Sequence, residues 1–102
     1  RRILSEAKVP GHYPNAHLEL AWFALGETLR GQNRDAEAVQ ALEQAAAQST
    51  VSAELKRRCL LEAGQVYEAM HEPTQAREQY LAVIAAGPES TQAEQARKYM
   101  RR

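Results

Sequence analysis

The stretch AWFALGETLRG at residues 21–31 decides the fold that this sequence predicts. Every residue from its start to Arg30 suits a helix except Gly26, because glycine in a helix interior costs about 1 kcal/mol relative to alanine. Apolar side chains recur through this region at spacings of three and four, as on the buried face of an amphipathic helix. They are Leu18, Ala21, Trp22, Leu25 and Leu29. We therefore expect a helix over residues 16–30, with Asn15 as its N-cap and a packing reason for Gly26.

The rest of the chain divides into further helix-length segments between well-spaced breakers. Valine and isoleucine are few, and no stretch alternates polar and apolar residues as a half-buried strand would. The expected helices cover residues 3–9, 16–30, about 35–48, 53–70, 73–86 and 90–102, with a turn-rich linker at 9–15. Pro73 suits the first turn of the helix that it begins. The connection after residue 30 is so short that the two flanking helices must fold back antiparallel.

Residues with particular backbone or capping preferences mark the ends of these helices. Gly31 is expected to end the helix over 16–30 in a left-handed conformation. Asn33 or Asp35 is expected to cap the helix that follows. Ser52 and Ser90 are expected to cap two later helices in the same way.

The sequence of the first helix pair aligns with that of the second when it is shifted by a constant number of residues. We call this number the repeat interval; it is the sequence separation between Gly26 and Gly64. The match of two glycines is informative because the chain has few glycines. The same interval matches Ala38 with Ala76, Leu29 with Tyr67, Leu42 with Tyr80, and Ala45 with Val83.

The glycine of each unit also keeps the same separation from an alanine. Gly26 is as far from Ala38 in the sequence as Gly64 is from Ala76. That spacing would place glycine opposite alanine on the antiparallel partner helix, where the two backbones approach closely.

In this ordered set of residues the chain resembles the tetratricopeptide repeat, a helix–turn–helix unit of about 34 residues. The first unit matches the family pattern at Trp22, Leu25, Gly26, Leu29, Ala38, Leu42 and Ala45. The second unit matches it at Ala63, Gly64, Tyr67, Ala76, Tyr80 and Pro88. The resemblance covers residues 17–88. It also departs from the family pattern. Leu29 and Leu42 stand where the family usually has aromatic residues, and Val83 replaces the second alanine of the second unit. Leu60 replaces the tryptophan of that unit, and the repeat interval is longer than the family's by about one helical turn.

The resemblance implies an all-α fold, a right-handed α-solenoid of antiparallel helix pairs. It divides the chain into a short N-terminal helix and linker at 1–15 and a repeat domain at 16–102. Within that domain, the first repeat covers about 19–52, the second about 57–90, and a capping helix about 90–102.

The resemblance also implies a function, because the first helix of each pair lines the concave surface where members of this family bind ligands. We expect a scaffolding module that binds a protein or peptide segment there. The candidate contact residues are Leu20, Phe23, Glu27, Arg30, Arg58, Leu61, Glu62, Gln65 and Glu68. Leu20, Phe23 and Leu61 would form an exposed apolar strip, unless the N-terminal segment or a preceding repeat covers it.

A second interpretation belongs to a different class of protein. Two helix pairs and a cap are close to the minimum for a stable stack, since each unit needs neighbours to cover its apolar face. The chain could therefore serve as a structural spacer within a larger protein. An uncovered end of the stack could also join two copies as a homodimer.

Composition argues against several other partners. The chain has 13 basic and 13 acidic residues, so it lacks the bulk charge that draws proteins to nucleic acid. No apolar run approaches the roughly 20 residues of a membrane span, so we expect no membrane insertion. The chain begins without methionine and reads as a fragment of a longer protein, whose compartment is unknown and cytoplasmic by default.

Residues capable of catalysis or metal binding do not form a recognisable motif. His12 and His17 are five positions apart, whereas a helical metal pair needs a spacing of three or four on one face. Cys59 is the only cysteine and lies in an apolar helical stretch, where it behaves as a small hydrophobe. We therefore expect no enzyme activity, no cofactor and no metal site.

Overall fold

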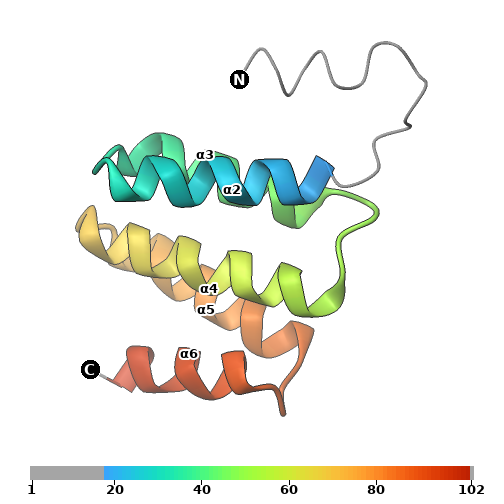
Figure 1. Ribbon diagram of the computed structural model, residues 1–102. Coiled ribbons are helices and arrows are strands. Elements are labelled where there is room, and N and C mark those ends of the chain that lie inside the picture. Colours follow the sequence, from blue (N-terminus) through green and yellow to red (C-terminus); the bar gives the residue numbers. More distant parts are fainter. Residues whose placement is uncertain (1–17, 102) are drawn as a thin grey trace.

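The computed structural model describes residues 18–101, and this part of the chain is all-α, with no strand. Its helices are α2 (Leu18–Gly31), α3 (Asp35–Ala47), α4 (Ala53–Ala69), α5 (Pro73–Ala86) and α6 (Thr91–Arg101) (Figure 1). The helices predicted over 53–70 and 73–86 agree with the structure to within one residue at either end. The helix predicted over 3–9, the linker at 9–15 and the cap at Asn15 lie outside the described residues.

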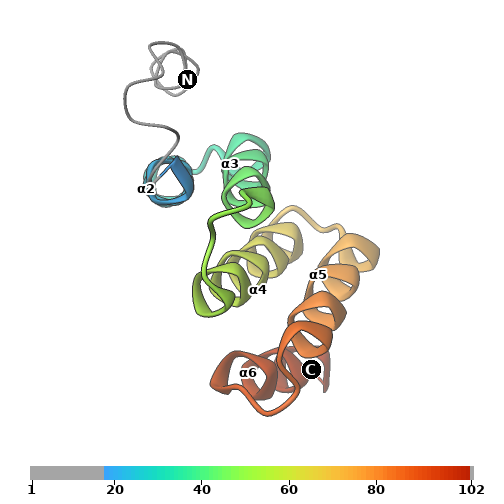
Figure 2. The same cartoon turned by 90° about the vertical axis from the view of Figure 1, so that its right-hand side faces the viewer.

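The helices form two hairpins and a final single helix, stacked in chain order. Each helix packs against the next one in the sequence, and α4 also contacts α6. Viewed end-on, α2, α4 and α6 lie along one side of the stack, while α3 and α5 lie along the other (Figure 2). The first helices of successive units therefore share one side of the molecule.

The turns inside the two hairpins are the same structure, repeated at the repeat interval. In the first turn, the amide of Arg34 donates to the carbonyl of Leu29 at 2.9 Å. In the second, the amide of Glu72 donates to the carbonyl of Tyr67, also at 2.9 Å. The internal repeat seen in the side chains is therefore confirmed in the backbone.

The left-handed residue of each turn is not the glycine that the sequence indicated. Asn33 has φ 62°, and His71, its counterpart one repeat interval later, has φ 63°. Gly31 is instead the last residue of α2. The expectation of a side-chain cap at Asn33 or Asp35 is also wrong, because the residue before α3 is Arg34 and its side chain makes no capping hydrogen bond. Asparagine is among the residues that tolerate this conformation best, so the turn can form without glycine.

Two of the predicted caps and the predicted proline position are confirmed. Ser52 Oγ accepts a hydrogen bond from the amide of Leu55 at 3.1 Å. Ser90 Oγ accepts one from the amide of Ala93 at 3.0 Å. Pro73 is the first residue of α5, where the missing N–H has no helical partner to lose.

Gly26 marks a close helix crossing, but its main neighbour differs from the prediction. A Cβ atom at Gly26 would lie 2.9 Å from Leu42 Cδ2 and 3.4 Å from the carbonyl oxygen of Ala38. At Gly64, a Cβ atom would lie 2.5 Å from Cε1 of Tyr80. Each glycine thus makes room chiefly for a large side chain on the second helix of its hairpin, and that side chain is fully buried in both hairpins.

Candidate functional site

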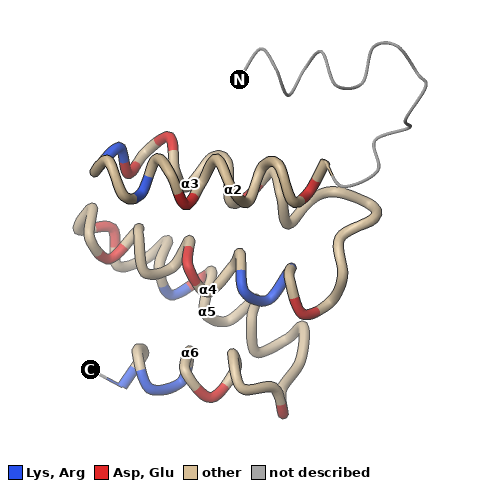
Figure 3. The backbone as a smooth tube through the Cα atoms, in the orientation of Figure 1, with Lys and Arg blue, Asp and Glu red and all other residues tan. Residues whose placement is uncertain are grey.

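The predicted polar site residues lie on one face of α2 and one face of α4. Glu27 and Arg30 are three positions apart on α2, while Arg58, Glu62 and Gln65 follow at spacings of four and three on α4. These spacings place each set on a single helix face. The basic residues of α4 lie between acidic ones along the helix (Figure 3). The facing surfaces of α2 and α4 therefore each carry acidic and basic side chains.

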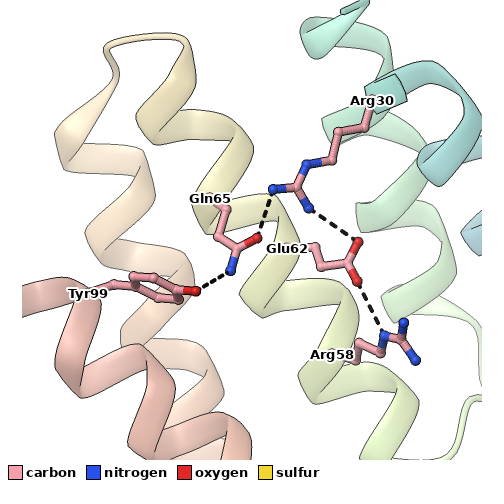
Figure 4. A network of polar contacts seen from close by, with 5 residues as sticks. All are labelled: Arg30, Arg58, Glu62, Gln65 and Tyr99. Atoms are coloured by element: carbon pink, nitrogen blue, oxygen red, sulfur yellow. Dashed lines mark hydrogen bonds and ion pairs between the residues drawn. The ribbon is translucent and has the colours of Figure 1, made fainter. Parts of the chain in front are cut away.

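Arg30 joins these two faces through a pair of contacts (Figure 4). Its Nη2 donates a hydrogen bond to Gln65 Oε1 at 2.8 Å, and its Nη1 lies 3.5 Å from Glu62 Oε1. On the other side of the carboxylate, Arg58 Nε donates to Glu62 Oε2 at 3.2 Å. Glu62 is thus held between two guanidinium groups from different helices.

The same network continues to α6 through Gln65. Gln65 Nε2 donates to the hydroxyl of Tyr99 at 2.8 Å, and the Tyr99 ring stacks on Tyr80 with centroids 5.6 Å apart. Tyr99 is not among the site residues that the sequence predicted, so its polar role was missed. The available signal was the position of Tyr99, which follows Gln65 by about the length of one tetratricopeptide unit.

Glu62 has the most perturbed carboxyl group of the network. Burial of its side chain, which is only 13% exposed, is the main cause that raises its pKa to about 7. The neighbouring Glu27 carboxyl raises the pKa further, while Arg58 and Arg30 lower it. The buried Glu62 Oε1 accepts no hydrogen bond within the described residues.

The apolar strip expected from Leu20, Phe23 and Leu61 is not exposed as a whole. Leu20 is 49% exposed, but Leu61 is only 5% exposed and packs against residues of α5 and α6. The physical reason is the stacking of successive first helices, since α6 covers the face of α4 that carries Leu61. The expected strip is therefore wrong at Leu61, which belongs to the core.

Phe23 occupies the equivalent position one repeat earlier and is half-buried. Its ring packs against apolar residues of α3 and α4, namely Val39, Leu42, Ala45, Ala46, Cys59, Ala63 and Val66. The Arg58 guanidinium lies over the ring, 5.1 Å from the centroid. Phe23 is therefore not an open apolar surface, because an exposed, charged side chain lies over its half-buried ring.

Two acidic residues lie outside this network. Glu68 is three positions beyond Gln65 on α4 and lines a shallow hollow of about 430 Å³ with His71 and Pro73. Glu19 was not predicted as a functional residue, yet it is buried and accepts a hydrogen bond from Thr50 Oγ1 at 2.8 Å. That bond ties the start of α2 to the connection before α4, which is a structural role.

The remaining reactive side chain, Cys59, is fully buried. Burial raises the pKa of its thiol to about 12, so it stays protonated and packs as an apolar group. Among residues 18–101, no group of three or more His, Cys, Asp or Glu side chains is placed to hold a metal ion. Within that range, no helix has the length and apolar character needed to cross a membrane.

Comparison with protein-family models, curated proteins and solved structures found no significant match to this chain.

Proposed function

We propose that this chain is a protein-interaction module that binds a peptide or protein segment on the face formed by α2, α4 and α6. We call this face the first-helix surface. It comprises the predicted residues Leu20, Phe23, Glu27, Arg30, Arg58, Glu62, Gln65 and Glu68, together with Tyr99. The observation that carries the proposal is the chain of contacts from Arg30 through Gln65 to Tyr99, which spans all three helices.

This network supports binding because it fixes polar groups before a partner arrives. Arg30 and Gln65 satisfy each other, so their positions are held by neighbours on other helices. Arg58 is more accessible, with 56% of its side chain exposed, and Leu20 offers an apolar contact at the N-terminal edge. A partner can therefore meet a rigid polar centre and two adaptable contacts at the rim.

The surface carries charges of both signs. Its acids are Glu27, Glu62 and Glu68, and its bases are Arg30 and Arg58. A segment with polar and charged side chains of both signs therefore fits it better than a strongly acidic one. We infer a binding role rather than catalysis, because no nucleophile is paired with a base on this surface among the described residues.

The proposed architecture is the right-handed α-solenoid of the tetratricopeptide repeat family. Three features support it: the matched turns at the repeat interval, the glycines facing buried large side chains in both hairpins, and the shared side of α2, α4 and α6. In that family the shared side is the concave one, so under this proposal the first-helix surface is the concave face.

The test selects peptides from a random displayed library against the full chain. The dissociation constants of selected peptides are then measured for wild type, Arg58→Ala, Gln65→Ala and the control Arg77→Ala, which removes an exposed arginine from α5. We expect at least about tenfold weaker binding for the Arg58 and Gln65 variants, equivalent to about 1.4 kcal/mol, and no change for the control. Circular dichroism melts verify that each variant folds.

The spacer interpretation gives the opposite result. A structural spacer would yield no peptide whose affinity depends on Arg58 or Gln65. Selection of peptides that bind all the variants equally would therefore contradict the proposed function.

A further inference from the structure

An apolar hollow of about 780 Å³ lies between α2 and α3, apart from the first-helix surface. Trp22, Leu25 and Leu29 of α2 form its apolar wall with Ala41 of α3, and only α2, α3 and the turn between them line it among the described residues. At its rim, Arg34 Nε pairs with Glu37 Oε1 at 2.6 Å. The hollow therefore combines an apolar floor with a polar edge, as an unfilled helix-packing site does.

The second hairpin has a face on α4 that corresponds to the apolar wall on α2, and another helix covers that face. Leu60, Ala63 and Tyr67 of α4 stand one repeat interval after the three wall residues of α2. Within the molecule, α3 packs on this face of α4: Leu42 joins Ala63 in one buried cluster, and Ala45 joins Leu60 in another. A helix related to α3 by one repeat would cover the hollow in the same way.

The sequence before α2 carries the residues of such a helix. Leu4 stands one repeat interval before Leu42, and Ala7 stands one repeat interval before Ala45. Pro10 disfavours helical conformation at the residue before it, Val9, and so ends a helix there. By the same interval, Val9 corresponds to the last residue of α3. Residues 3–9 thus carry apolar side chains at the positions that correspond to the inward residues of α3. The proline signal that ends a helix also falls at the position that corresponds to the end of α3.

The connection also has the required length. Ala7 and Trp22 have the same sequence separation as Ala45 and Leu60, which share a buried cluster. A connection of this length therefore already allows the contact between Ala45 and Leu60. The entropy cost of closing the loop between Ala7 and Trp22 is similar, because this cost depends on the length of the loop.

We propose that residues 3–9 of this chain dock in the hollow, with Leu4 toward Leu25 and Ala7 toward Trp22. These residues lie outside the described part of the chain, and the proposal rests on the hollow and on the repeated contact. Lys8 departs from the pattern, because Ala46 stands in its place one repeat later. Ala46 is buried, with 7% of its surface exposed, so a lysine in the equivalent place has to extend its stem along the apolar wall to keep its ammonium in water.

Trp22 is the only tryptophan of the chain and therefore reports on the hollow directly. The test measures acrylamide quenching of Trp22 fluorescence in the full chain for wild type, Leu4→Ser and the control Glu6→Ser. Glu6 matches the exposed Gln44 one repeat later, so its replacement should leave a docked helix in place. We expect the quenching constant to rise about twofold for Leu4→Ser and to stay unchanged for Glu6→Ser.

A second variant, Ala7→Glu, checks the result from another position, because it would place a charge against Trp22 and should raise quenching as well. Far-ultraviolet circular dichroism verifies that the rest of the helices remain folded. Equal quenching in all four proteins would overturn the proposal. Quenching that falls as wild-type concentration rises, with a doubled mass in sedimentation, would also overturn it, because a second copy would then fill the hollow. Peptide binding at the first-helix surface is a separate measurement and does not depend on this result.

Discussion

Gly64 and Tyr80 pack so closely that a methyl group on the glycine would lie 2.5 Å from Cε1 of the ring. The same relationship occurs one repeat interval earlier, where a methyl group on Gly26 would lie 2.9 Å from Leu42 Cδ2. In each hairpin the glycine lets a large buried residue of the second helix reach the backbone of the first. The packing gained at the crossing offsets the poor helix propensity of glycine.

Replacing Gly64 with alanine should therefore destabilise the fold. The ring of Tyr80 is 1% exposed and stacks on Tyr99, so it has little room to move away from a new methyl group. We expect Gly64→Ala to lower the free energy of unfolding by about 1–3 kcal/mol, despite the gain in helix propensity. Urea denaturation measures this change.

Gly31 is the matched control, because a Cβ atom there would meet no atom within 4 Å. Gly31→Ala should leave stability unchanged or raise it by up to about 1 kcal/mol. Equal effects at Gly31 and Gly64 would show that helix propensity alone, and not the contact with Tyr80, governs these positions.

Leu61 provides a test of core packing. Its buried side chain lies against α5 and α6, so Leu61→Ala should cost about 2–4 kcal/mol of unfolding free energy. Leu81→Ala makes the same chemical change at a leucine that is 45% exposed and should cost less than about 1 kcal/mol. Thermal and urea unfolding of the two variants give the comparison; a similar small loss at both positions would mean that Leu61 is a surface residue.

His71 provides a test of the repeated turn. It has φ 63°, a conformation in which residues other than glycine are strained. We expect His71→Gly to raise the unfolding free energy by about 0.5–1 kcal/mol and His71→Val to lower it, because a β-branched residue fits this region poorly. Chemical denaturation establishes the order of the three proteins. A valine variant more stable than the glycine variant would rule out the left-handed turn.

Glu62 should make stability depend on pH. Its pKa is raised to about 7 in the folded chain from an ordinary value of 4.5, so the folded state binds more protons than the unfolded state between these values. The unfolding free energy therefore decreases as pH rises through this window. Below about pH 4.5 the carboxyl is protonated in both states and its favourable contribution is fully present.

Glu62→Gln removes this titration and keeps the size of the side chain. Relative to wild type, the variant should gain stability progressively as the pH rises from 4.5 to about 7, as measured by urea midpoints. Glu78→Gln removes a negative charge from the exposed surface of α5 and serves as the control. A difference between Glu62→Gln and wild type that stays constant across this range would contradict the raised pKa.

Several of the described helix ends were predictable because local signals set them. Ser52, Pro73 and Ser90 act at the helix ends where their chemistry indicated. The left-handed residue was not predictable in this way, because Gly31 has the stronger intrinsic preference. The turn instead places that conformation at Asn33, where the hydrogen bonds of the hairpin close.

The members of the candidate site were partly predictable, but their surroundings were not. The resemblance implies that Arg30, Glu62 and Gln65 share the surface made by the first helices, and in the structure Arg30 contacts the other two. Neither the resemblance nor helix periodicity says how closely successive first helices approach one another. That distance decides that Leu61 is covered by α6 and that Gln65 reaches Tyr99. Burial and cross-helix contacts depend on tertiary packing, which a single helix pattern does not contain.

We propose that α2, α4 and α6 together form the partner-binding face. The most direct measurement is a titration of the isotopically labelled full chain with a selected peptide, followed by amide and side-chain NMR shifts. We predict that the largest shifts fall on Arg30, Gln65 and Tyr99, while Gln40 and Arg77 on α3 and α5 stay unchanged. Shifts confined to α3 and α5, with none on the first-helix surface, would contradict the claim.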